Sequence, residues 1–226
     1  ITTDKVYKNN NWDFGYRETD SLGGHDPYSA SKAAADIAIA SWRSSFCGTE
    51  KGQTSQLLIS TARAGNVIGG GDWSPNRIFP DVVRATQNEK PIQLRNPNSL
   101  RPRQHVLEPL SGYLQLAEKM YWYGDQYCQA YNFGPDINSC RSVKDLTEEV
   151  LTHCHGSWID ASSKALHEAA RLHLNSDKSF NHLGWQPRWP FKKTVEATIN
   201  WYLKAYNGHS AAECCLHDIS DFLSSS

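Results

Sequence analysis

The chain has 226 residues, enough to bury a sizeable core in one large domain or two small ones. Its formal net charge is −1 and it has no run of Lys or Arg, so nucleic acid and anionic membranes are poor candidates for its main partner. Its apolar runs are too short to span a bilayer, and its first residues do not resemble a signal peptide. The composition therefore favours a globular protein with a small-molecule site.

The first residue is not Met and already lies in a predicted strand, so we expect the sequence to be part of a longer protein. The six cysteines show no C-x-x-C spacing, which favours free thiols in the reducing cytoplasm over zinc or redox chemistry. Cys214 and Cys215 lie close to His217, but adjacent side chains point in different directions. We therefore expect no metal site.

The chain begins with a predicted strand that ends in charged residues. Ile1–Thr3 is β-branched and favours a strand, and Asp4 and Lys5 follow at once. In open α/β sheets, ligands bind at the carboxyl ends of strands. Residues 8–26 are polar and lack an apolar period, so we expect a loop over the edge of the sheet.

The next segment contains a candidate catalytic pair. Residues 27–46 are rich in helix-forming residues, and Pro27 suits the first helical position. Tyr28 and Lys32 are four residues apart and so share one helical face. A phenol titrates near pH ~10, and a neighbouring ammonium stabilises the phenolate, so Tyr28 could take a proton from a hydroxyl. The spacing also arises by chance, with the tyrosine packed and the lysine solvated.

A predicted buried strand, residues 57–63, leads into a Gly-rich turn, residues 64–73. Three consecutive glycines let the backbone approach a ligand closely, although most such turns are only structural. The turn matches neither the G-x-G-x-x-G fingerprint nor a P-loop, so we do not assign it to cofactor phosphates. Residues 78–88 then predict a helix and residues 91–95 a short strand.

An arginine-rich segment, residues 95–104, is expected to be a loop. Its guanidinium groups, on Arg95, Arg101 and Arg103, suit a pyrophosphate because they bind phosphate oxygens in pairs, although each could equally be solvated. The remaining expected elements are a helix from Leu110 to Tyr121 with a core-facing stripe, a strand at 130–133, a helix from Ser142 to Cys154, a short strand at 171–174, a long helix ending near Tyr206 and a short helix with a frayed tail.

Six segments carry a family resemblance: TTDKVY, DPYSASK, RAGNVIGGGDW, QHVLEPLSGYL, YNFGP and LGWQPRW, at residues 2–7, 26–32, 63–73, 104–114, 131–135 and 183–189. Together they resemble the extended short-chain dehydrogenase/reductase family, and within it the branch that dehydrates CDP-glucose. The dTDP-glucose branch carries Thr-Asp-Glu where this chain has Thr3-Asp4-Lys5. Two departures are Arg103, where an aromatic residue is expected, and residues 175–178. The family's glycine fingerprint and its first strands are not among these residues.

The resemblance implies an α/β fold: the C-terminal part of a doubly wound, Rossmann-type parallel sheet plus a smaller α/β substrate-binding domain. It implies a dinucleotide-binding part over residues 1–73, a mainly nucleotide-sugar-binding part over 74–206 with segments that return to the sheet, and a tail over 207–226. The implied cofactor is NAD, the implied substrate is CDP-D-glucose, and the implied assembly of the intact protein is a homodimer or homotetramer. The implied reaction gives CDP-4-keto-6-deoxy-D-glucose by oxidation at C4, loss of water across C5 and C6, and return of a hydride to C6.

The resemblance also implies individual roles. Tyr28 would take the proton of the C4 hydroxyl, Thr3 would hydrogen-bond that oxygen and Lys32 would hold the cofactor ribose. Asp4 would be the acid of the dehydration and Lys5 its base. The implied site residues are Thr3, Asp4, Lys5, Tyr28 and Lys32 for catalysis; Thr2, Tyr28, Lys32, Ala64, Asn66 and Val67 for the cofactor; and Asn66, Arg77, Arg95, Arg101, Asn132 and His167 for the substrate. The alternatives are a dTDP-glucose dehydratase or a nucleotide-sugar 4-epimerase of the same fold, or a truncated homologue without catalysis.

Overall fold

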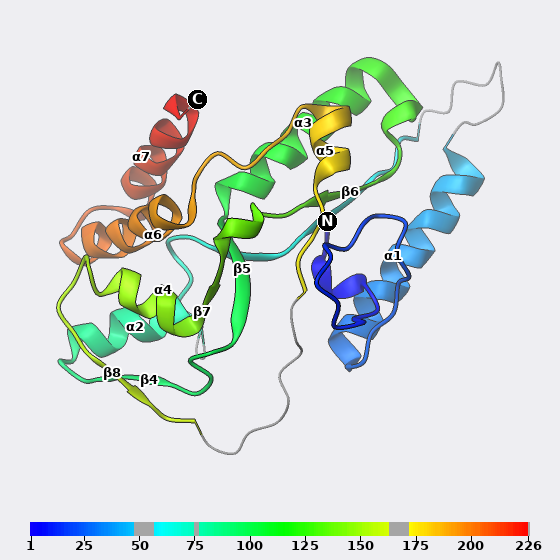
Figure 1. Ribbon diagram of the computed structural model, residues 1–226. Coiled ribbons are helices and arrows are strands. Elements are labelled where there is room, and N and C mark those ends of the chain that lie inside the picture. Colours follow the sequence, from blue (N-terminus) through cyan, green and yellow to red (C-terminus); the bar gives the residue numbers. More distant parts are fainter. Residues whose placement is uncertain (48–56, 75–76, 163–171, 226) are drawn as a thin grey trace. The chain divides into compact units, whose positions relative to one another are not determined.

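The computed structural model describes residues 1–47, 57–74, 77–162 and 172–225 (Figure 1). The chain divides into two compact units, each built from three separate segments. Unit 1 comprises Ile1–Gly65, Glu108–Pro135 and Arg171–Gln186, and unit 2 comprises Asn66–Leu107, Asp136–Ala170 and Pro187–Ser226. The first boundary therefore falls at Gly65 rather than at the expected Trp73, and residues 207–226 belong to unit 2.

Unit 1 is built on a parallel sheet of three strands, in the order β1 (Thr2–Thr3), β2 (Thr61–Ala64) and β6 (Ala130–Phe133). Its helices are η1 (Asp4–Val6), α1 (Pro27–Phe46), most of α3 (Leu107–Tyr123), η2 (Gly124–Tyr127) and α5 (Asp177–Leu183). The main core joins α3, α5 and the sheet and contains Ala62, Leu116, Tyr131, Phe133, Leu183 and Trp185. A Cβ at Gly112 would lie 2.3 Å from the Phe133 ring, so only glycine lets α3 approach the sheet this closely.

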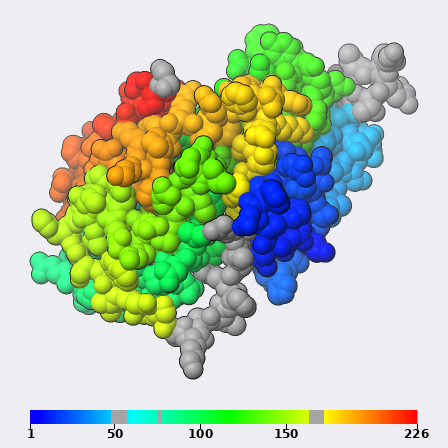
Figure 2. All heavy atoms as spheres, in the orientation of Figure 1, coloured from blue at the N-terminus to red at the C-terminus, as the bar shows by residue number. Residues whose placement is uncertain are grey.

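Unit 2 has a sheet in the order β3 (Asn66–Ile68), β5 (Leu100–His105) and β7 (Cys140–Ser142), with β3 parallel and β7 antiparallel to β5. A second, parallel pair joins β4 (Ile92–Leu94) and β8 (Trp158–Asp160). The helices are α2 (Ile78–Gln87), η3 (Ile137–Ser139), α4 (Val143–Val150), α6 (Phe191–Tyr206) and α7 (Ala211–Ser224). Helices α6 and α7 pack together, and their orange and red surfaces adjoin in Figure 2. The residues expected to form a tail therefore contribute to a packed core, through Cys214 and Phe222.

The expected α/β class is confirmed, and most expected elements are present. Helix α1 has the expected bounds, and α4 begins at Ser142 with the expected capping box to Asp145. None of the described helices is both long and apolar enough to cross a lipid bilayer.

Four local expectations were wrong. The turn expected at 64–73 contains a strand, β3, which pairs with β5. The segment at 95–104 contains a strand, because β5 has hydrogen-bonding neighbours on both sides. Arg103 within it is buried and donates to the Arg141 carbonyl at 3.4 Å, so it does not line an open loop. The strand expected at 57–63 begins only at Thr61, as β2, and ends at Ala64. The strand expected at 171–174 is reduced, in its described part, to a bridge from Leu174 to Tyr16.

His105 at the end of β5 is buried beside an acidic residue. Its ring centroid lies 4.8 Å from that of Trp189, and Leu107 N–H donates to its Nδ1 at 3.4 Å. Its Nε2 lies 4.0 Å from an Asp218 carboxylate oxygen. Burial lowers the pKa of His105 to about 4 and raises the pKa of Asp218. At neutral pH the ring is therefore neutral, and the contact with Asp218 is not an ion pair.

We predict that unit 2 loses stability as the pH falls from 6.5 towards 4. In that window the unfolded chain protonates His105 and the folded chain does not, so the free energy of unfolding falls by about 3 kcal/mol. His105→Asn removes this titration. Asp218, with its raised pKa, acts in the opposite direction in both proteins, so the difference between them isolates His105. Urea unfolding at neutral pH and at pH 4 measures that difference; identical pH dependence in both proteins would contradict the prediction.

Candidate active site

Helix α1 presents Tyr28 and Lys32 as the sequence predicts. The Asp26 carboxylate caps the helix by accepting from Tyr28 N–H at 3.0 Å and Ser29 N–H at 3.1 Å, and the Ser29 hydroxyl donates back to Asp26. These bonds lower the pKa of Asp26 and fix the first turn, which carries Tyr28. Tyr28 is 55% exposed, and Lys32 Nζ lies 5.9 Å from the centroid of its ring. The ammonium therefore lies within electrostatic reach of the phenol.

Thr3, Asp4 and Lys5 form a hydrogen-bonded group at the carboxyl end of β1. Thr3 Oγ1 donates to Asp4 Oδ1 at 2.9 Å and accepts from Lys5 N–H at 3.3 Å. Lys5 Nζ lies 3.3 Å from Asp4 Oδ2, with Asp4 buried and Lys5 partly exposed. Helix α1 contacts η1, which contains Asp4 and Lys5. All five predicted catalytic residues therefore belong to unit 1.

A buried ion pair joins α1 to the sheet. Arg63 of β2 donates to Asp36 of α1 through Nε at 2.9 Å and Nη2 at 2.7 Å, and both side chains are almost fully buried. Thr2 Oγ1 donates to the same carboxylate at 3.0 Å, and Arg63 Nη1 donates to the Tyr7 hydroxyl at 2.7 Å. Thr2 was expected to bind the cofactor, but its hydroxyl is engaged with Asp36.

Asn132, expected to bind the substrate, belongs to the same buried network. Its Oδ1 accepts from the Tyr7 hydroxyl at 2.8 Å, and its Nδ2 donates to the carbonyls of Tyr16 at 2.8 Å and Asn175 at 3.1 Å. Burial raises the pKa of Tyr7 to about 12, so Tyr7 remains a neutral donor. The amide of Asn132 thus holds segments of unit 1 together. Because both ends of the amide are hydrogen-bonded within the unit, we do not propose Asn132 as a substrate-binding residue.

The Gly-rich segment supplies one unsatisfied polar group. Ala64 ends β2 in unit 1, whereas Asn66 and Val67 begin β3 in unit 2. The Asn66 Nδ2 is buried and has no hydrogen-bond partner among the described residues. Buried donors are normally paired, so this amide fits a position that a ligand completes.

The predicted substrate arginines lie in unit 2, and His167 lies outside the described residues. Arg77 immediately precedes α2, Arg95 follows β4 and is exposed, and Arg101 lies on β5. Arg101 is directly opposite Arg141 of β7 in the antiparallel ladder. Like charges in opposed positions repel each other, so the pair suits an anion. Sequence reasoning missed Arg141, because only the strand register brings it beside Arg101.

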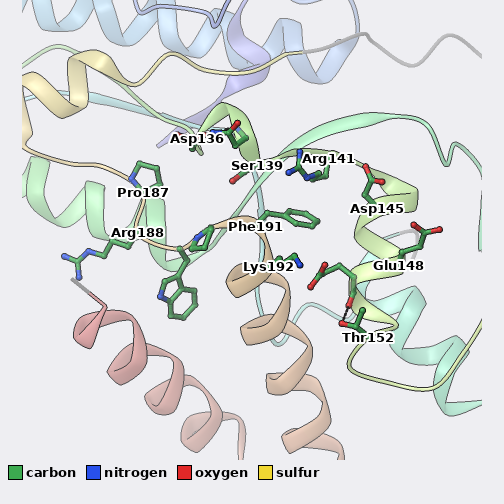
Figure 3. A pocket seen from close by; sticks show the side chains of 14 residues that line it. Asp136, Ser139, Arg141, Asp145, Glu148, Thr152, Pro187, Arg188, Phe191 and Lys192 are labelled. Atoms are coloured by element: carbon green, nitrogen blue, oxygen red, sulfur yellow. Dashed lines mark hydrogen bonds between the residues drawn. The ribbon is translucent and has the colours of Figure 1, made fainter.

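A pocket of about 870 Å³ opens in unit 2, between α4, β7 and residues 187–192 (Figure 3). Figure 3 shows Asp145 and Glu148 along α4, with the Phe191 ring pointing towards that helix. The pocket is lined by acidic side chains of α4, Asp145 and Glu148 among them, and by the basic side chains of Arg188 and Lys192. Hydrogen bonds with Ser142, the residue that caps α4, lower the pKa of Asp145. No predicted catalytic residue lines the pocket, so we place the chemistry in unit 1 on the strength of its acid–base groups.

Comparisons with known proteins show what the chain as a whole is similar to. No protein-family model matches the chain. CDP-glucose 4,6-dehydratase of Salmonella typhimurium is 38% identical over 226 residues, which cover 99% of this chain and 63% of that protein. The dTDP-D-glucose 4,6-dehydratase of Mus musculus is 24% identical, over 96% of this chain and 58% of that protein. The solved structure of dTDP-glucose 4,6-dehydratase from Bacillus anthracis in complex with NAD matches with a TM-score of 0.71 at 22% identity, over 92% of this chain and 61% of that one.

The chain therefore has the fold of the extended short-chain dehydrogenases/reductases. Within that class it is similar to CDP-glucose 4,6-dehydratase, which confirms the resemblance inferred from its motifs. The chain spans about three fifths of the length of these relatives.

We predict that Arg63→Met lowers the free energy of unfolding by about 3–5 kcal/mol, because it leaves the Asp36 carboxylate buried and unpaired. The matched control is Arg17→Met. Arg17 pairs with Asp20 at 3.5 Å but is 67% exposed, so its loss should cost at most about 1 kcal/mol. Urea unfolding measures both variants. Similar losses in the two would show that burial of the Arg63 pair does not matter.

Proposed function

We propose that the whole protein converts CDP-D-glucose to CDP-4-keto-6-deoxy-D-glucose with bound NAD, in the cytoplasm. The observation that carries the proposal is the contact between Asp4 and Lys5 beside Thr3. Loss of water across C5 and C6 needs a base at C5 and an acid at the C6 hydroxyl. Epimerisation at C4 needs no acid or base at C5 or C6. The similarity to CDP-glucose 4,6-dehydratase, and the lysine at position 5, favour this reaction over the dTDP-glucose and epimerase alternatives.

The first step takes place at C4 of the sugar. Tyr28, as a phenolate, accepts the proton of the C4 hydroxyl, and the Lys32 ammonium beside its ring stabilises that phenolate. The Thr3 hydroxyl turns from Asp4 to hydrogen-bond the C4 oxygen. NAD, when bound, supplies the oxidation at C4 and the return of the hydrogen at C6.

The dehydration uses Asp4 and Lys5. The C4 ketone makes the C5 proton acidic, the Lys5 amine accepts that proton, and Asp4 gives a proton to the leaving C6 hydroxyl. Lys5 must be neutral to act as a base. The Lys5 Nζ lies 3.3 Å from Asp4 Oδ2, so one proton can pass between the two groups. When the Asp4 carboxyl carries that proton, the Lys5 amine is neutral and can act as the base.

The residues present fit part of a dinucleotide site. In unit 1, Tyr28 and Lys32 would hold the nicotinamide ribose, and the backbone at Ala64 would lie beside it. Asn66 and Val67, which belong to unit 2, stay cofactor predictions from the resemblance. The Asn66 amide, which has no hydrogen-bond partner among the described residues, suits a ligand carbonyl or phosphate.

The nucleotide diphosphate would be bound by arginines of unit 2. Arg101 and Arg141 would act as a pair, with Arg77 and Arg95 contributing further positive charge. His167 and the homodimer or homotetramer of the intact protein stay predictions from the resemblance.

We predict that Tyr28→Phe lowers turnover of CDP-D-glucose by at least about a hundredfold, because it removes the base that deprotonates the C4 hydroxyl. Binding of the CDP-sugar, measured by calorimetry, should stay nearly unchanged, since the reacting hydroxyl is the one group of the sugar that Tyr28 is proposed to contact. Tyr121→Phe, an exposed phenol of unit 1, is the matched control and should keep full activity. Undiminished turnover in Tyr28→Phe would remove Tyr28 from this role.

We predict that Lys5→Met stalls the reaction after oxidation at C4, because no base then removes the C5 proton. The absorbance of reduced nicotinamide should rise and persist after one addition of substrate. Lys8→Met, at an exposed lysine three residues on, should behave as the wild type. Normal product release by Lys5→Met would place the C5 base elsewhere.

A further inference from the structure

One carboxylate ties the helix that carries Tyr28 to the strand that carries Thr3. Tyr28, Lys32 and Asp36 are spaced four apart on α1 and therefore lie along one face, with Asp36 about 12 Å from Tyr28 along the axis. The Asp36 carboxylate accepts from Thr2, the residue before Thr3, at 3.0 Å. The relative position of the helix and the strand is thus set by a partly buried hydrogen bond two turns along α1 from the reacting phenol.

Arg63 holds that carboxylate in one orientation. Arg63 and Thr2 are partners in the parallel ladder of β1 and β2, so both reach Asp36 from neighbouring strands. The guanidinium occupies both carboxylate oxygens, at 2.9 and 2.7 Å, which prevents rotation of the Asp36 side chain. Arg63 also donates to the hydroxyl of Tyr7, the residue that follows η1. Hydrogen bonds to Asp36 and from Arg63 therefore hold the chain on both sides of Asp4, at Thr2 and at Tyr7.

We propose that Thr2, Asp36 and Arg63 are positioning residues that fix Thr3 relative to Tyr28, and that Thr2 does not bind the cofactor. The inference rests on the proposed function. A base and its hydrogen-bonding partner must reach the same hydroxyl at once, and a displacement of about 1 Å can cost about a hundredfold in rate. The loss of the Thr2 hydroxyl frees β1 to shift against α1.

The test compares three variants of the protein at its natural length. Thr2→Val keeps the shape of the side chain and removes the hydroxyl, and Thr2→Ser keeps the hydroxyl. Thr61→Val is the matched control: Thr61 is buried on β2 and accepts from Arg43 of α1 at 3.4 Å, so it joins the same helix to the same sheet at the other end of α1.

With CDP-D-glucose, Thr2→Val should lose about tenfold to a hundredfold in kcat, while KM and the content of bound NAD stay within about twofold of the wild type. Thr2→Ser should recover most of the loss, and Thr61→Val should keep kcat within about twofold. Loss of bound NAD in Thr2→Val would return Thr2 to the cofactor site and overturn the inference. An unchanged kcat in Thr2→Val would overturn it as well.

Hydrogen–deuterium exchange supplies a readout that needs no turnover. Backbone amides of residues 3–7 should exchange faster in Thr2→Val than in the wild type or Thr61→Val, because β1 and η1 lose their tie to α1. Equal exchange in all three proteins would overturn the inference. Wild-type protein that fails to turn over CDP-D-glucose while the exchange result holds would instead overturn the proposed function alone.

Discussion

The buried pair between Arg63 and Asp36 is the interaction on which unit 1 depends. Moving two charges out of water is costly, and the cost is offset only when every polar atom finds a partner. Here the guanidinium is met by Asp36 and Tyr7, and the carboxylate by Arg63 and Thr2. Tyr7 in turn donates to Asn132, which holds the carbonyls of two further segments. One helix, three strands and the loop after η1 are therefore held by a single network. The same network restricts the positions of Tyr28 on the helix and Thr3 on the strand.

Much of the candidate site could be predicted because it is local. The capping of α1 by Asp26 and Ser29 involves neighbouring residues, and the spacing of Tyr28 and Lys32 follows from the helical period. The contact between Asp4 and Lys5 also joins residues adjacent in sequence. Such features depend on the chain within one turn or one strand end, which sequence patterns describe well.

What could not be predicted depends on partners far away in the sequence. The prolines around β5, Pro97 and Pro102, argue against a strand, yet β5 forms because β3 and β7 pair with it on both sides. The strand register, not the spacing, places Arg141 opposite Arg101. Thr2 and Asn132 have residue types that suit a ligand site, but their hydrogen bonds are taken by Asp36 in one case and by Tyr7 with two carbonyls in the other. A sequence motif identifies such residues without showing whether their polar groups face a ligand or the core.

The central claim is that unit 1 carries two acid–base pairs, Tyr28 with Lys32 for C4 and Asp4 with Lys5 for C5 and C6. The most direct measurement follows hydrogen positions through the reaction, with the protein at its natural length and CDP-D-glucose deuterated at C4. We expect a 4-keto-6-deoxy product that carries this deuterium at C6, and, in a parallel reaction in heavy water, solvent deuterium at C5. A product inverted at C4 with C6 unchanged would contradict the claim, since it would show the C4 pair at work without the C5 and C6 pair.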